Sequence, residues 1–103
     1  YFRMAGTEEA FVNLARKAGR TKGWGDCYGL WLLLAGRVDV VVEPLLHPWD
    51  IEWVWPLAQA SGIKLTDWHG RDCASPRQCI VSHGGPLHDE VASILQPHAL
   101  DNV

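Results

Sequence analysis

The sequence predicts an α/β fold, in which helices cover the faces of a small layered sheet. Segments whose apolar residues recur at helical spacing alternate along the chain with short runs rich in β-branched residues. The 103 residues are 48% hydrophobic and 20% charged, which is the balance of a globular domain. Elements in such an interleaved order pack as layers around one core. We therefore expect a single domain over residues 1–103, with the order α-α-β-α-β-β-α.

The limits of each element follow from the residues that start and end it. Thr7 is expected to cap the first helix, with Glu8 and Glu9 in its first turn, and Gly19 to end it. The other expected elements are a helix over 27–35, a strand over 38–43, a helix over 49–60 bent at Pro56, strands over 63–68 and 79–82, and a helix over 86–95.

The expected burial of side chains follows from the same patterns. The helix over 27–35 is apolar on nearly every face, which predicts that it is buried. The last helix is expected to point Leu87, Val91, Ile94 and Leu95 inward. Histidines are mostly exposed or half-exposed, so we expect His47, His88 and His98 at the surface.

Charge and cysteine content exclude several classes of protein. The net charge is −3 and Lys and Arg form no stripe, so nucleic acid is not an expected partner. The apolar run over 30–34 is too short for a bilayer, and the first residues do not form a signal peptide. These features predict a cytoplasmic protein without a membrane partner, in which three cysteines stay reduced. His69, Cys73, Cys79 and His83 offer zinc-binding groups, but their spacing matches no common zinc motif, which favours ordinary thiols.

Four motifs follow one another in a specific order. Gly25-Asp26-Cys27-Tyr28-Gly29 opens the apolar helix, and the strand that follows ends at Glu43. His47-Pro48-Trp49-Asp50 and Thr66-Asp67-Trp68-His69-Gly70 come next. This series resembles the carboxy-terminal half of the inositol monophosphatase superfamily, and within it the histidinol-phosphatase branch. The resemblance covers nearly the whole chain and implies the fold of that half.

The resemblance implies a magnesium-dependent phosphatase that hydrolyses a small phosphate monoester, with Asp50 as a magnesium ligand. Physical chemistry makes this role possible, since a carboxylate at a helix start is held ionised and magnesium prefers hard carboxylate oxygens. The alternative is that Asp50 only stabilises the helix start. No residue of this half is expected with certainty to be catalytic.

Glu43, Asp26, Lys22 and Gly25 are the substrate-binding residues that the resemblance implies. Glu43 ends a strand, where α/β proteins place ligand-binding groups, although a solvated strand end is an equal alternative. Asp26 either contacts substrate or simply caps its helix. Lys22 stands where the family usually has arginine, and lysine lacks the planar fork needed for a bidentate contact.

Two departures from the family pattern concern activity. Glu52 and Trp53 stand where small alanines are usual, and Gln59-Ala60-Ser61-Gly62 replaces the usual Glu-Ala-Gly-Gly. The family's other metal ligands lie in an amino-terminal half, in a glutamate and an Asp-Pro-Ile-Asp-Gly-Thr run that these residues lack. One carboxylate does not assemble a multi-magnesium site, so we expect this chain alone to be inactive.

The run that begins at Gly25 resembles the histidinol-phosphatase pattern, which implies histidinol phosphate as the preferred substrate. Inositol phosphates and nucleotide bisphosphates are the alternatives, and a non-catalytic binding or assembly module is an alternative of another class. The expected partners are a small phosphorylated metabolite and the amino-terminal half of the same enzyme. Apolar faces that this half would cover also predict self-association into a homo-oligomer.

Overall fold

The computed structural model describes residues 2, 6–21, 23 and 28–100. Its elements are α1 (Glu8–Lys17), α2 (Tyr28–Leu34), β1 (Val40–Glu43), α3 (Pro48–Ile51), α4 (Val54–Ser61), β2 (Lys64–Thr66), β3 (Cys79–Ser82), α5 (Gly85–Leu95) and the 3-10 turn η1 (Gln96–His98). The α/β class and the order of elements are confirmed, except that the third expected helix is two helices.

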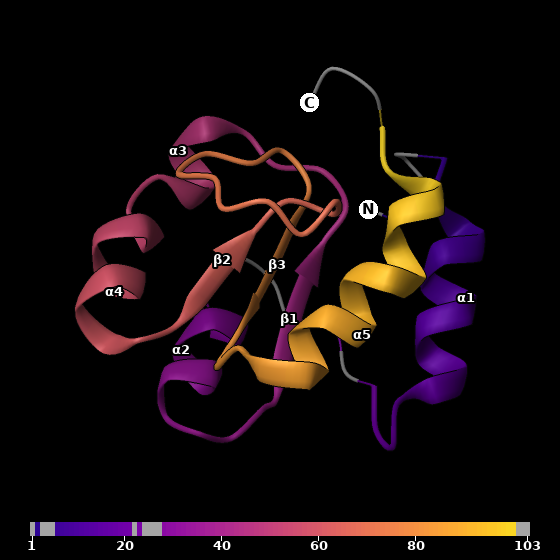
Figure 1. Cartoon of the computed structure of the whole chain (residues 1–103), viewed down its shortest axis with the longest axis horizontal. Coiled ribbons are helices and arrows are strands. Elements are labelled where there is room, and N and C mark those ends of the chain that lie inside the picture. The colour runs from indigo at the N-terminus through magenta and orange to yellow at the C-terminus, as the bar shows by residue number, and fades with distance from the viewer. Residues whose placement is uncertain (1, 3–5, 22, 24–27, 101–103) are drawn as a thin grey trace.

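A three-stranded antiparallel sheet forms the middle layer, with β3 between β1 and β2. Val81 of β3 pairs with Val41 on one side and with Leu65 on the other. Successive side chains of a strand point to opposite faces, so Val81 and Ile80 enter different cores. Helices α2 and α4 cover one face, while α5 covers the other with α1 beside it (Figure 1).

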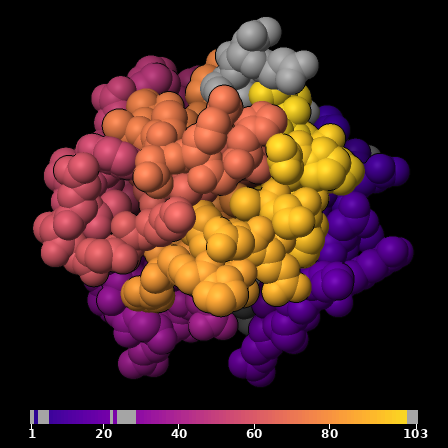
Figure 2. Space-filling view, viewed as in Figure 1, coloured from indigo at the N-terminus to yellow at the C-terminus, as the bar shows by residue number. Residues whose placement is uncertain are grey.

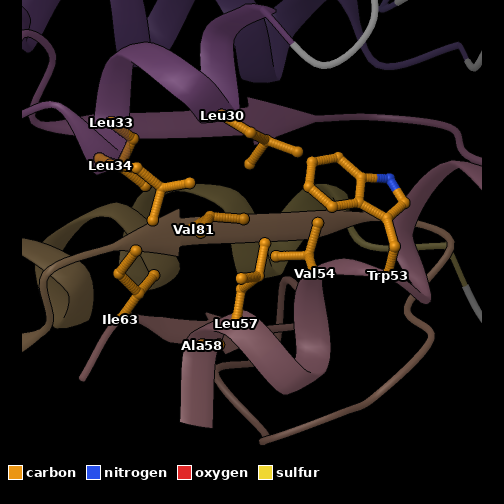
Figure 3. A pocket seen from close by; sticks show the side chains of 9 residues that line it. All are labelled: Leu30, Leu33, Leu34, Trp53, Val54, Leu57, Ala58, Ile63 and Val81. Carbon is orange, nitrogen blue, oxygen red and sulfur yellow. The ribbon is translucent and has the colours of Figure 1, made fainter. Parts of the chain in front are cut away.

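The core on the first face joins α2 and α4 across β3. Leu30 and Leu33 of α2 point toward Val54 and Ala58 of α4, with Val81 between them (Figure 3). All five side chains are buried, and each fully buried aliphatic side chain stabilises the fold by about 1.5–3 kcal/mol. This packing fixes α4, and with it the short helix α3 that precedes it.

The core on the second face is built around Trp68. This side chain is 0% exposed, and its Nε1–H donates to the carbonyl of Cys79 over 3.2 Å. Val91 and Leu95 of α5 pack in the same cluster. In the space-filling view, α5 lies in the middle of the visible face and α1 along its side (Figure 2).

The helix expected over 49–60 is interrupted at Glu52 and Trp53, and α4 runs through Pro56. A proline cannot donate to the carbonyl four residues earlier, and its ring clashes with that carbonyl. For Pro56 that residue is Glu52, which is where the helix stops. Pro56 itself then lies in the first turn of α4, where a backbone N–H has no intrahelical partner.

Three expectations of burial were wrong. Trp31 and Leu34 of α2 are 59% and 42% exposed, because only one side of this helix faces the sheet. Leu87 is 42% exposed, whereas His88 is buried at 1% and occupies the inward position of α5. Thr7 stands at the N-cap position of α1 with Glu8 and Glu9 in the first turn, as expected, although its hydroxyl donates to the carbonyl of Phe2 and not to a helix N–H. The first two strands are also shorter than expected, at 40–43 and 64–66.

Candidate functional site at the end of β1

Glu43 is the last residue of β1 and is half-buried, opposite Cys79 in the neighbouring strand. Burial raises the pKa of the Cys79 thiol far above its usual range, and the negative charge of Glu43 raises it further. The thiol therefore stays protonated, which makes it neither a nucleophile nor a metal ligand. The Glu43 carboxylate, in contrast, acts on its surroundings as a negative charge.

Asp50 is exposed and lies in the single turn of α3. Its Oδ2 accepts the backbone N–H of His47 over 3.0 Å, and its carbonyl accepts the indole N–H of Trp53 over 3.0 Å. Pro48 occupies the first helical position, where its fixed φ suits the start of a helix. A carboxylate has about four lone-pair positions, so this bond orients Asp50 and leaves capacity for a cation.

The loop between Glu43 and Asp50 is held by contacts that the sequence did not predict. The N–H of Leu46 donates to the carbonyl of Arg77 over 2.7 Å, and the Arg77 Nε–H donates back to the carbonyl of Leu46 over 3.3 Å. The rings of His47 and Trp49 stack with centroids 4.5 Å apart and planes at 12°. No sequence motif marks Arg77, since its partner is a backbone carbonyl.

The structure thus places two of the expected site residues, Glu43 and Asp50, at the two ends of one anchored loop. Lys22, Gly25 and Asp26 lie outside the described residues. His47 is exposed, as expected.

Donor chemistry decides which metal these residues fit. Asp50 offers a hard oxygen of the kind that magnesium prefers, and it would be one ligand among several. The zinc alternative has no support, because the described part of the chain holds no group of three or more His, Cys, Asp or Glu placed to bind a metal. Cys79 is buried in β3, and the His83 ring contacts the carbonyl of Leu33 at 3.0 Å.

Known proteins resemble this chain in both sequence and structure. The histidinol-phosphatase of Chlorobaculum parvum is 38% identical over 65 residues, which are 63% of this chain and 25% of that protein. The histidinol-phosphatase of Mycobacterium tuberculosis is 32% identical over 91 residues, which are 87% of this chain and 34% of that protein. A solved inositol monophosphatase from Zymomonas mobilis superposes with a TM-score of 0.77 at 27% identity, covering 86% of this chain and 36% of that one. No protein-family model matches.

The fold and these matches define the class as proteins with the inositol monophosphatase fold. Within that class, the chain is a homologue of the histidinol-phosphatases, which confirms the resemblance seen in the sequence. The chain spans about a third or less of the length of these relatives. None of the helices in the described ranges has the length and apolar character that crossing a membrane requires.

Proposed function

We propose that this chain is the carboxy-terminal part of a magnesium-dependent phosphatase that hydrolyses a small phosphate monoester, with histidinol phosphate as the preferred substrate. The observation that carries the proposal is the oriented, exposed carboxylate of Asp50, fixed by the N–H of His47 in a chain whose relatives are histidinol-phosphatases. We use "complete enzyme" for the polypeptide that joins this chain to the amino-terminal half implied by the family.

Asp50 would hold one magnesium ion on the substrate side of α3. Magnesium in such a site neutralises phosphate charge and lowers the pKa of bound water. The contribution of this chain is to present one anionic oxygen in a fixed orientation, because the bond to His47 and the bond from Trp53 hold residue 50 at both its side chain and its carbonyl.

Glu43 would contact the ammonium group of histidinol phosphate. Its carboxylate is half-buried at a strand end, where a charged hydrogen bond to a cation is stronger than in open water. Asp26, Gly25 and Lys22 would be further substrate-binding residues, as the family resemblance implies. The partners in this proposal are the phosphorylated metabolite and the amino-terminal half, without which this chain is inactive.

Two other relatives bear on the substrate, and the second of them is named as an inositol-1-monophosphatase. One, from Arabidopsis thaliana, is described as the bifunctional phosphatase IMPL2, and it is 41% identical over 46 residues. Another, from Thermotoga maritima, is a fructose-1,6-bisphosphatase/inositol-1-monophosphatase, 31% identical over 61 residues. Inositol phosphates are therefore the alternative substrates within the same chemistry.

The test is phosphate release by the complete enzyme from histidinol phosphate, inositol 1-phosphate and a nucleotide bisphosphate, each with magnesium and with EDTA. We expect magnesium-dependent turnover with the highest kcat/KM on histidinol phosphate. If kcat/KM were highest on inositol 1-phosphate, inositol phosphates would replace histidinol phosphate as the proposed substrate. Magnesium-independent turnover would overturn the metal assignment, and turnover on none of the three phosphates would leave a non-catalytic binding or assembly module.

A further inference from the structure

Three buried polar side chains meet where α5 crosses the sheet, at the opposite end of β3 from Cys79. Thr66 of β2, Ser82 of β3 and His88 of α5 are each at most 1% exposed. Thr66 Oγ1 lies 2.7 Å from His88 Nε2, and Ser82 Oγ lies 2.6 Å from His88 Nδ1. Gly84 and Gly85, with φ of +86° and +74°, form the sharp turn that returns α5 onto β3, in a conformation that other residues adopt only with strain.

The partners of the two hydroxyl groups assign the protons on the His88 ring. Thr66 has one hydroxyl proton, and it donates that proton to the carbonyl of Asp67 over 2.9 Å. Thr66 Oγ1 must therefore accept from His88, which places a proton on Nε2. Nδ1 of a neutral ring is then an acceptor, and Ser82 donates to it while its oxygen accepts the N–H of Gly84 over 2.9 Å. All the donors in this chain of hydrogen bonds therefore point the same way, from the Gly84 N–H to the carbonyl of Asp67.

We propose that His88 is a pH-sensitive lock, which holds α5 on the sheet while its ring is neutral and releases the helix when Nδ1 gains a proton. A proton on Nδ1 would face Ser82, whose hydroxyl would then have to turn away from its acceptor. A buried donor that loses its partner destabilises the folded state, and does so more strongly beside a charge. Protonation at Nδ1 of His88 is therefore the event that opens the lock, because this atom already accepts the Ser82 hydroxyl.

The charges around His88 set the direction of the response. Lys64 of β2 opposes a positive ring, while Asp89 of α5 and Asp72 of the segment before β3 favour one. Burial has the largest effect and lowers the pKa of His88 below its ordinary 6.5, with Lys64 adding to the shift. The unfolded chain therefore binds this proton at a higher pH than the folded chain does. Stability is full above pH 6.5 and is lost as the pH falls below it, toward the pKa of the folded state.

Opening would be local, because α5 and the β2–β3 pair are held to the rest of the fold by different interactions. α5 meets the sheet through Val91 and Leu95, which pack on Ile80 and Trp68. β2 and β3 remain joined by their own ladder, from the pair of residues 64 and 82 to the pair of residues 66 and 80. Release of α5 would therefore expose the core around Trp68 while the sheet persists, in the manner of sub-global opening.

The test is amide hydrogen exchange of this chain by NMR from pH 8 to pH 5, together with the ¹⁵N shifts of the His88 ring. We expect an Nε2–H neutral ring, and protection at Val91–Leu95 that falls about tenfold for each pH unit below 6.5, while protection in β3 stays constant. His88→Gln can still donate and accept but does not titrate, so it should remove the pH dependence. His69→Gln, at an exposed histidine, is the matched control and should retain it.

Two results would overturn the proposal. One is a neutral ring with its proton on Nδ1. The other is α5 protection that stays constant while the ring titrates, which would make His88 an ordinary buried side chain. Both are measured on the unsubstituted chain, so the test does not depend on whether His88→Gln folds.

Discussion

The two ends of strand β3 carry polar groups of opposite kinds. At the Cys79 end, the neighbouring loop presents Asp50 to solvent, and its side chain accepts a hydrogen bond from the His47 N–H. At the Ser82 end, three buried side chains, Thr66, Ser82 and His88, are joined by a continuous series of hydrogen bonds. Exposed polar groups with spare capacity suit a ligand, whereas buried groups with full hydrogen bonding stabilise a fold. Substitutions should therefore affect turnover at one end and stability at the other.

The largest expected effect is on turnover, from Asp50→Asn in the complete enzyme. Asn caps a helix about as well as Asp, but it removes the charge that would hold magnesium. We expect turnover to fall by about 100-fold or more, with almost no change in melting temperature. Asp39→Asn, at another exposed carboxylate, is the control and should change neither. Unimpaired turnover in Asp50→Asn would leave only the helix-start role.

At the Ser82 end of β3, the substitution Thr66→Val should lower stability. Valine keeps the shape of the threonine side chain and removes its hydroxyl. The His88 N–H and the Asp67 carbonyl would each lose a buried partner. We expect the free energy of unfolding to fall by about 1–3 kcal/mol, measured by urea denaturation of this chain. Thr21→Val, at an exposed threonine, should have almost no effect. Equal stability of the two variants would contradict the contrast between the two ends.

A smaller, substrate-selective effect is expected for Glu43→Gln in the complete enzyme. Losing a charged hydrogen bond to an ammonium group costs about 1.5–3 kcal/mol. KM for histidinol phosphate should therefore rise by about tenfold or more, with little change for the phosphate of an uncharged alcohol. Steady-state kinetics on both substrates decides this, since equal changes would show that Glu43 does not meet the ammonium group.

The smallest expected effect concerns assembly through α2. Trp31 and Leu34 are exposed on this helix, and Trp53 and Leu57 are exposed nearby, which favours self-association. We expect a dimer or larger species by light scattering, shifted toward monomer by Trp31→Ser. Val12→Ser, at an exposed position of α1, should leave the mass unchanged. A monomeric mass of the unsubstituted chain across a concentration series would contradict this prediction.

Local signals in the sequence were enough to predict the order of elements and the strand end at Glu43. The dense β-branched run before Glu43 forms a strand whatever its neighbours are, and Pro48 marks a helix start by its fixed φ. One helix with a bend at Pro56 was expected, and the helix is instead interrupted at Glu52 and Trp53, because Pro56 acts on the carbonyl four residues earlier.

The sequence did not predict the burial of His88. A histidine becomes a stable core residue only when partners satisfy both ring nitrogens, and here those partners come from β2 and β3, 22 and six residues away. The Arg77 anchor was missed for a similar reason, since its partner is the carbonyl of Leu46, 31 residues away. Distant contacts of this kind leave no spacing pattern to recognise.

Magnesium binding at Asp50 is the most direct test of the proposed site, and calorimetric titration measures it without an assay of turnover. We expect a saturable site in the complete enzyme that weakens by about tenfold or more in Asp50→Asn. We also expect no saturable site at millimolar magnesium in this chain alone, because it brings one carboxylate. Unchanged affinity in Asp50→Asn, or tight stoichiometric binding by this chain alone, would contradict the assignment of Asp50 as one ligand of a shared metal site.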